Sequence, residues 1–237
     1  MSVSIVMPCY NEEKSIEKVI VDYYHEIIDK IDDSEFIVVD DCSNDQTPHI
    51  LSKMQNKFPK LRILKPDVNG GHGKAIRLGY ETAKKEWVFQ VDSDNQFKSK
   101  DFWLLYELTD KYDFILGFRK KRHDPAARLV LTKLIRLVNY VLFRVWIKDA
   151  NCPFRVIKGG LLREALKRID KETLAPNIMV SILMKINRIK MAEVPIAHYE
   201  RKTGVVSLQS HKLIKFVIKG FRQLMQFKKN LRLWSWA

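Results

Sequence analysis

The chain has 237 residues, which suits one large domain and is too short for two domains of ordinary size. Its 42 lysine and arginine residues outnumber 28 aspartate and glutamate residues, and the formal net charge of +14 favours an anionic partner: a phosphorylated substrate, an acidic membrane surface or a nucleic acid. The three cysteines form no CxxC pair, which argues against a zinc site or a disulfide framework and fits a reducing cytosol.

Strands and helices alternate in the first half of the chain. β-Branched and apolar runs predict strands at residues 3–7, 35–39, 61–64, 87–91 and 114–117. Helical spacing predicts helices at 16–27 and 74–84, and Thr47-Pro48, a cap residue followed by proline, predicts the start of another. This alternation predicts an α/β fold with a mostly parallel sheet whose ligands bind beyond the carboxyl ends of its strands.

The second half is more helical. Asp124-Pro125 predicts the start of a long amphipathic helix that reaches about Trp146, and a second amphipathic helix is predicted from about Ser210 to Lys229. No linker rich in glycine, proline or serine separates the halves. We therefore expect one domain, residues 1–207, followed by a basic helical extension, residues 208–237.

The extension has two interpretations. Its apolar stripe with a cationic border is typical of a helix in a membrane interface, where Trp234 and Trp236 would add anchors at headgroup depth. The same pattern also fits a helix packed on the sheet with its lysines in water. No secretory signal and no run of about 18 uncharged apolar residues is visible, so we expect a cytoplasmic protein, peripheral on the inner face of the membrane.

Polar motifs follow three of the predicted elements. Asp92-Ser93-Asp94 places two carboxylates at i and i+2, where they can hold a hard cation, although such pairs also occur in loop caps and turns. Asp40-Asp41 ends another strand and fits an Asx-rich turn as well. The turn at residues 69–74, which includes His72, can present backbone amides to a phosphate or can be a simple connection.

Taken together, these motifs resemble the large inverting glycosyltransferase family 2, which has the GT-A (Rossmann-like) fold. The resemblance rests on three segments at successive strand ends within the first 100 residues: Val3 to Glu13, Ile37 to Thr47 and Val91 to Asp94. It implies an enzyme that transfers a sugar from a nucleotide-diphosphate sugar.

Further residues resemble the polyprenyl-phosphate branch of that family, which includes dolichyl-phosphate mannose synthase. They are Gln96, Gly117-Phe118-Arg119, Arg128, Thr132, and Asp149 with the segment Asn151 to Arg155. Pro153 stands where the branch usually has glycine, and the QxxRW motif of processive synthases is absent.

The resemblance implies a role for each matching residue. The nucleotide sugar would be bound by Pro8, Tyr10, Asn11, Glu12, Asp40, Asp41, Asp92, Ser93 and Asp94. Asp92, Asp94 and Gln96 would hold a divalent cation, Mg²⁺ or Mn²⁺, and Arg119, Arg128 and Thr132 would bind the acceptor phosphate. Asp92, Asp94, Arg119 and Arg128 are the predicted catalytic residues.

The predicted reaction transfers the sugar to a polyprenyl (dolichyl or undecaprenyl) phosphate at the membrane surface. A phosphate monoester is mostly dianionic at neutral pH and needs no general base, and no motif in the sequence indicates one. The alternative is a family 2 enzyme that uses a glycan hydroxyl acceptor. A nucleic-acid-binding protein is suggested by charge alone, since no recognition module is found, and an inactive scaffold is disfavoured by the intact Asp92 and Asp94.

Overall fold

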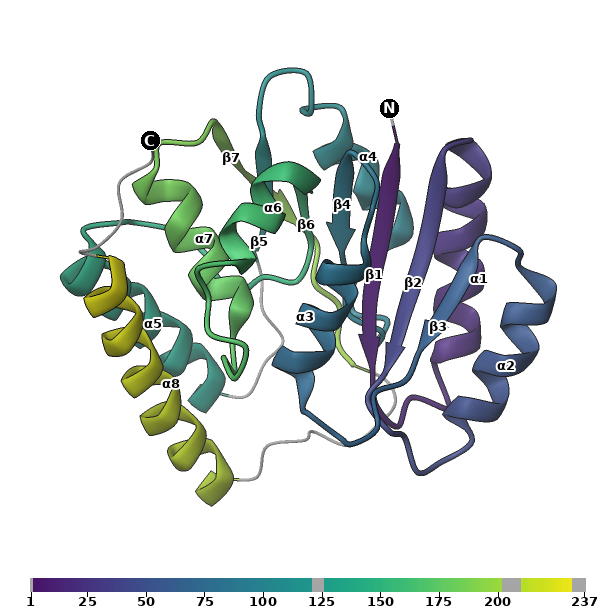
Figure 1. Ribbon diagram of the computed structural model, residues 1–237, viewed down its shortest axis with the longest axis horizontal. Coiled ribbons are helices and arrows are strands. Elements are labelled where there is room, and N and C mark those ends of the chain that lie inside the picture. The colour runs from purple at the N-terminus through teal and green to yellow at the C-terminus, as the bar shows by residue number, and fades with distance from the viewer. Residues whose placement is uncertain (1, 121–125, 202–209, 232–237) are drawn as a thin grey trace.

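The computed structural model describes residues 2–120, 126–201 and 210–231, and their side chains apart from those of 126–130 and 210–216. The described residues form one seven-stranded sheet in the order β3-β2-β1-β4-β6-β5-β7 (Figure 1). The strands are β1 (Val3–Cys9), β2 (Ser34–Asp40), β3 (Leu61–Leu64), β4 (Trp87–Gln90), β5 (Phe114–Arg119), β6 (Arg155–Lys158) and β7 (Met191–Ile196). Strand β6 runs antiparallel to β4 and β5, and the other pairs are parallel, which confirms the predicted mostly parallel α/β fold.

The five predicted strands are present, but β6 and β7 were not predicted. β6 is four residues long and begins with a fully buried arginine, Arg155, which breaks the apolar pattern that marks a buried strand. β7 is only partly buried over Met191–Val194 and contains a proline, so its alternation is weak. β6 lies between β4 and β5, and β7 pairs with the other side of β5 at the edge of the sheet.

Helices cover both faces of the sheet. One face is covered by three helices that contact one another: α3 (His72–Thr82), α6 (Gly159–Leu166) and α7 (Pro176–Ile186). The other face is covered by two helices in contact, α1 (Ile16–Glu26) and α2 (Thr47–Lys57). Three short helices lie between strands: η1 (Ile28–Lys30), η2 (Ser99–Asp101) and α4 (Phe102–Tyr106). Thr47 was predicted to be the N-cap of α2. In the structure Gln46 is the N-cap, and Thr47 is the first residue of the helix. The Thr47 hydroxyl instead accepts a hydrogen bond from the Glu12 backbone amide at 2.9 Å.

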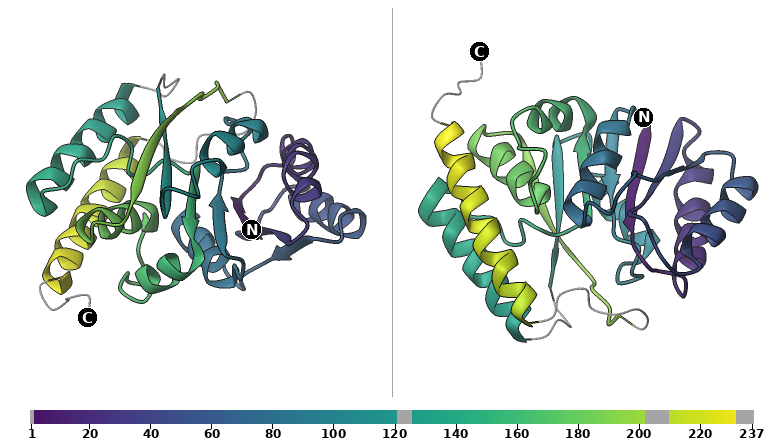
Figure 2. Two further views of the ribbon diagram at one scale, coloured as in Figure 1. Left: turned by 90° about the horizontal axis from the view of Figure 1, so that it is seen from above. Right: turned by 60° about the horizontal axis from the view of Figure 1, so that its bottom comes forward.

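Helices α5 (Ala126–Phe143) and α8 (Ser210–Leu231) lie side by side beyond the β7 end of the sheet (Figures 1 and 2). α5 ends at Phe143 rather than at Trp146, because Arg144 adopts a left-handed conformation with φ of 57°. Leu224 and Phe227 of α8 are buried, so this helix packs on the protein with part of its apolar stripe. The predicted start at Asp124-Pro125 and the anchors Trp234 and Trp236 lie outside the described residues.

Within the described ranges, none of the helices is both long enough and apolar enough to cross a membrane.

Candidate active site

The residues predicted to bind the nucleotide sugar and the metal lie at or just after the ends of β1, β2 and β4, at the lower edge of the sheet in Figure 1. Cys9 pairs with Asp40 in the parallel register of β1 and β2. The Val91 backbone amide donates to the Val6 carbonyl at 3.1 Å, which brings the residues after β4 beside the end of β1. The parallel topology therefore joins three loops whose sequences are far apart.

Each of these loops contains one residue in the left-handed region. The φ values are 54° at Asn11, 60° at Cys42 and 58° at Asn95. Asparagine tolerates this conformation, whereas cysteine adopts it at some cost in backbone energy. Such conformations are concentrated at functional sites, where the surrounding structure holds them in place.

The β1 and β2 loops are held together by hydrogen bonds between backbone and side chains. The Asn11 amide donates to the Ser43 hydroxyl at 2.9 Å, and the Asn44 amide donates to the Asn11 side-chain oxygen at 2.8 Å. Tyr10 is 40% exposed beside them, and its hydroxyl accepts a bond of 3.4 Å from the Asn44 side chain. Pro8 lies within β1 and its backbone pairs with Val39. The predicted nucleoside residues are thus brought together, with an aromatic ring exposed among them.

Asp40 and Asp41 are almost fully buried, at 1% and 3% exposed. The Asp40 carboxylate accepts the Ser43 amide at 3.0 Å. The two Asp41 oxygens accept the amides of Gly70 and Gly71 at 2.8 and 2.7 Å. The glycine-rich turn therefore directs these two amides at Asp41 and connects β3 to α3. The contacts of Asp40 and Asp41 with a nucleoside stay predictions.

Asp92 and Asp94 form a pair of interacting carboxyl groups. Desolvation and the charge of Asp92 raise the pKa of Asp94 to about 7, well above the usual range of a carboxyl group. The Asp94 carboxylate accepts the Gln96 amide at 3.2 Å, and Ser93 between them is buried. Two like charges held together in a partly desolvated loop are destabilised unless a proton or a cation compensates them.

A buried chain of hydrogen bonds positions Asp92. The Gln90 side chain donates to Asp92 at 3.1 Å, and its oxygen accepts the Asn177 amide at 2.9 Å. The Asn177 oxygen in turn accepts the Tyr80 hydroxyl at 2.8 Å. Helices α3 and α7 thereby fix the direction of the first carboxylate. This support was not predicted, since only the fold brings Tyr80, Gln90 and Asn177 together.

We expect Asn177→Ala to loosen this chain. It leaves buried polar atoms of Tyr80 and Gln90 without their Asn177 partner, which costs about 1–3 kcal/mol of unfolding free energy. Urea denaturation measures that loss, and steady-state kinetics should show lower turnover with little change in donor KM, because Asp92 is no longer held. Unchanged stability and turnover would contradict the positioning role. Thr82→Ala, which removes a hydroxyl bonded to the Leu78 carbonyl on the same α3 helix, is the control.

The carboxylates of Asp92 and Asp94 could supply some, but not all, of the ligands of a hard divalent cation. Carboxylate oxygens are the ligands that Mg²⁺ and Mn²⁺ prefer, and such ions usually complete their coordination with water and phosphate oxygens. Burial, and after it the charge of Asp92, raise the pKa of Asp94, and a bound cation would offset both effects. Over the described ranges, no cluster of three or more His, Cys, Asp and Glu side chains could hold a metal by itself. Gln96 donates its side-chain amide to the Tyr199 carbonyl at 3.0 Å, so its part in a metal site stays a prediction.

Two further residues reach this site from distant parts of the sequence. Arg201, after β7, donates to Glu12 at 2.6 Å across 189 positions. Glu12 is 7% exposed, and its burial raises its pKa. The His72 ring nitrogen Nε2 lies 3.6 Å from Asp92 Oδ1, at the start of α3, with 58% of its side chain exposed. A motif search could single out His72 as a loop histidine, whereas nothing local in the sequence indicates the Glu12–Arg201 pair.

Arg119 forms a two-pronged ion pair with Asp149. Its Nε and one terminal nitrogen donate to the two Asp149 oxygens at 2.7 and 2.9 Å, and both side chains are largely buried. Arg155 supports the neighbouring segment by donating to the carbonyls of Ala150 and Cys152. The structure thus joins two sequence motifs of the polyprenyl-phosphate branch. Thr132 lies on α5, and the side chain of Arg128 is outside the described residues, so the phosphate site of Arg119, Arg128 and Thr132 stays a prediction.

Comparison with known proteins agrees with this geometry. Residues 4–170 match the family described as glycosyl transferase family 2. A dolichyl-phosphate beta-glucosyltransferase of Trichomonas vaginalis is 25% identical over 248 residues, covering 97% of this chain and 75% of that protein. An undecaprenyl-phosphate 4-deoxy-4-formamido-L-arabinose transferase of Edwardsiella ictaluri is 27% identical over 221 residues, covering 91% of this chain and 65% of that protein.

The fold has solved counterparts as well. Glucosyl-3-phosphoglycerate synthase from Mycobacterium tuberculosis, crystallised with Mn²⁺ and uridine-diphosphate-glucose, superposes with a TM-score of 0.67 at 19% identity, covering 96% of this chain and 79% of that one. At this identity the likeness concerns the fold, and it confirms the GT-A architecture. With the family match spanning the three strand-end loops and the Asp92–Asp94 pair, the chain belongs to glycosyltransferase family 2 and is a glycosyltransferase.

Proposed function

We propose that this enzyme transfers a sugar from a nucleotide-diphosphate sugar to a polyprenyl phosphate, with inversion at the anomeric carbon. The observation that carries the proposal is the carboxylate pair Asp92–Asp94 at the edge of the sheet, where the β1 and β2 loops offer Tyr10 and Asn11 to a nucleoside. A divalent cation, Mg²⁺ or Mn²⁺, held by Asp92 and Asp94 would neutralise charge on the diphosphate. The mycobacterial synthase was crystallised in complex with Mn²⁺ and uridine-diphosphate-glucose, which supports this cofactor.

The residues of the chain have separate tasks in this reaction. Tyr10, Asn11 and the buried acids Asp40 and Asp41 shape the nucleoside site. Arg119, held in plane by Asp149, presents its guanidinium to the acceptor phosphate. An oxygen of that phosphate forms a bond to the anomeric carbon while the bond from this carbon to the diphosphate oxygen breaks, and the leaving nucleoside diphosphate takes the electron pair.

Two observations favour a polyprenyl phosphate as the acceptor: the charge of a phosphate monoester and the similarity to two relatives. A phosphate monoester is already ionised at neutral pH, so the transfer requires no general base. The Trichomonas and Edwardsiella relatives both have names that give a polyprenyl phosphate as acceptor, which supports the same class here at moderate identity. A glycan hydroxyl acceptor is the second candidate, and it would need a base near the anomeric carbon.

One experiment separates the two acceptors. The purified protein is given radiolabelled UDP-glucose, GDP-mannose and other nucleotide sugars with Mn²⁺ and either undecaprenyl phosphate or a mixture of oligosaccharides. We expect label to enter the organic phase with the lipid phosphate alone. Label in oligosaccharide, with none in lipid, would contradict the proposal and favour the hydroxyl acceptor.

We also propose that the enzyme works as a peripheral protein on an anionic membrane surface. On α8, Ile218, Phe221 and Met225 are 49%, 46% and 37% exposed, so the packed helix leaves an apolar stripe uncovered. Lys219, Arg222 and Lys229 are the basic residues beside this stripe on α8, and all three are exposed. An exposed apolar stripe with a basic border suits the interface of an anionic bilayer.

Reversing these charges tests the membrane proposal. We expect the wild-type protein to sediment with phosphatidylglycerol-containing vesicles at 50 mM salt and to be released at 0.5 M, because salt screens the attraction. Lys219→Glu, Arg222→Glu and Lys229→Glu together should abolish sedimentation, since each basic residue contributes about 1 kcal/mol near anionic lipid. The control, Lys53→Glu with Lys57→Glu on α2, should leave it unchanged. If both variants lost sedimentation equally, binding would depend on the net charge of the protein and not on α8.

A further inference from the structure

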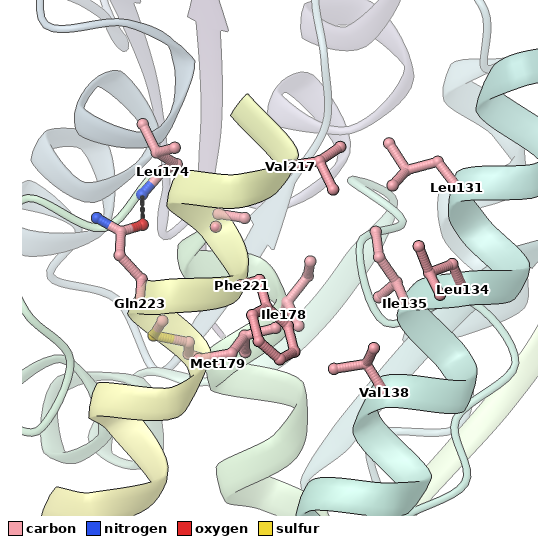
Figure 3. Close-up of a pocket in the computed structure, with 13 residues that line it drawn as sticks. Leu131, Leu134, Ile135, Val138, Leu174, Ile178, Met179, Val217, Phe221 and Gln223 are labelled. Carbon is pink, nitrogen blue, oxygen red and sulfur yellow. Dashed lines mark hydrogen bonds between the residues drawn. The ribbon is translucent and has the colours of Figure 1, made fainter. Parts of the chain in front are cut away.

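An apolar groove runs between α5 and α8, with α7 as its floor (Figure 3). Val217 and Leu131 face each other across it, and Ile178 and Met179 lie beneath. Its volume is about 80 Å³. Gln223 is the polar side chain of the lining, and it is already engaged, because its oxygen accepts the Leu174 amide at 3.0 Å and its nitrogen donates to the Glu172 carbonyl.

The groove is open along its length. Leu134 of α5 and Phe221 of α8 both line it and are each 46% exposed. Two further exposed apolar residues of α5, Leu137 and Val141, continue from Leu134 at helical spacing. Pockets lined by aliphatic and aromatic side chains exclude water and accept hydrocarbon. The lining therefore suits a flexible apolar chain, and among the side chains that the structure describes it offers no unengaged polar group to a sugar or a peptide backbone.

One end of the groove borders the start of α3. Leu174, which lines it, lies against the start of α3, since a Cβ atom added to Gly73 would be 2.5 Å from the Leu174 carbonyl oxygen. Gly73 follows His72, whose ring nitrogen is 3.6 Å from Asp92. Leu131 and Ile135 of the lining also flank Thr132, the predicted acceptor-phosphate residue. The groove is thus bordered by the start of α3, where His72 lies, and by the α5 segment that contains Thr132.

We infer that this groove binds the isoprenoid chain of the acceptor, in the units that follow the one attached to its phosphate. The inference rests on the proposed function and adds to it a binding site for the hydrocarbon. The phosphate would lie beyond the Leu131 end of the groove, the second and third isoprene units would lie between α5 and α8, and the rest of the chain would leave past Leu134 and Phe221 into the membrane. Both helices then hold the lipid acceptor as well as facing the bilayer.

Gly220 provides a direct test, because it lines the groove and a Cβ atom added there meets no atom within 4 Å. Gly220→Leu should fill the groove while favouring the helix. Gly160→Leu is the control, because Gly160 is also helical and a Cβ atom added there also meets no atom within 4 Å, and it lies exposed on α6, outside the groove. Circular dichroism and thermal unfolding first verify that both variants are folded.

The acceptors are farnesyl phosphate, with three isoprene units, and dimethylallyl phosphate, with one. We expect Gly220→Leu to raise the KM for farnesyl phosphate at least tenfold and to leave the donor KM unchanged, with a much smaller effect on dimethylallyl phosphate. Calorimetric titration with farnesyl phosphate, without donor, should show the same loss of affinity. Gly160→Leu should match the wild type in every measurement.

Two outcomes overturn the inference in different ways. If the wild type uses farnesyl phosphate and Gly220→Leu has the same KM and affinity for it, the chain binds elsewhere and the proposed function stands. If the wild type transfers sugar to no lipid phosphate, the proposed function fails, and the inference fails with it.

Discussion

Replacing either member of the carboxylate pair should almost abolish sugar transfer. We expect Asp92→Asn and Asp94→Asn each to lower kcat by on the order of 10²–10³-fold, the loss typical when one group that stabilises developing charge is removed. Asparagine keeps the volume of aspartate and can still accept the bonds from Gln90 at position 92 and from the Gln96 amide at position 94. Steady-state kinetics with saturating Mn²⁺ measures the change.

The same variants should lose their response to metal while remaining folded. Mn²⁺ should raise the melting temperature of the wild type, since a ligand that binds the folded state alone stabilises it, and it should have little effect on either variant. Asp110→Asn, at an exposed turn position after α4, is the control and should behave as the wild type. Full turnover in either folded variant, or in excess chelator, would rule out the metal site.

Without metal, the stability of the folded protein should depend on pH because the pKa of Asp94 is raised. The pKa of Asp94 is about 7 in the folded state, against ~3.9 for an unfolded aspartate. The folded state therefore holds a proton that the unfolded state has released, so this group's stabilisation is complete below about pH 4 and lost as pH rises through 7. We expect Asp94→Asn to remove that loss, so its melting temperature without metal should exceed the wild type's at pH 8.

Arg119→Lys should impair acceptor use far more than donor binding. Lysine keeps the charge but cannot form a two-pronged contact with phosphate, and it also breaks the fork that Arg119 makes with Asp149. A charged hydrogen bond is worth about 1.5–3 kcal/mol, so the acceptor KM should rise roughly 10- to 100-fold. The affinity for nucleotide sugar, measured by calorimetry, should change little. Arg128→Lys is expected to act in the same direction.

Asp149, the ion-pair partner of Arg119, and the distant Arg62 provide the controls. Asp149→Asn removes the negative charge that holds the Arg119 plane and should raise the acceptor KM more mildly, with donor affinity unchanged. Arg62→Lys disturbs an arginine–carboxylate pair with Glu35, on β3 and β2, and should have no kinetic effect. If Arg119→Lys weakened donor and acceptor equally, Arg119 would belong to the diphosphate site instead.

Much of the fold could be predicted because its signals are local. The first three predicted strands and the helices between them follow from apolar periodicity and from turn residues, which depend on neighbours a few positions away. The carboxyl-end rule then places the Asp40 and Asp92 loops on one edge of a parallel sheet without any knowledge of long-range contacts. The resemblance to family 2 rests on the same three loops.

Contacts between distant segments required the tertiary structure. β6 pairs with both β4 and β5 although its buried Arg155 conceals it in the sequence, because hydrogen bonds to backbone carbonyls compensate the burial of that charge. The Glu12–Arg201 pair and the chain from Tyr80 to Asp92 join residues up to 189 positions apart. No periodicity encodes such pairs, since they depend on how finished elements pack.

The helices α5 and α8 show the division most clearly. The sequence by itself determined that both are amphipathic, because the stripe follows from helical spacing alone. It did not determine whether a stripe is covered, and both interpretations of the extension were open. The tertiary structure buries Leu224 and Phe227 and leaves Ile218, Phe221 and Met225 exposed. Which part of an apolar face is buried depends on the shape of the neighbouring surface, and here the gap that remains between the two helices is the groove.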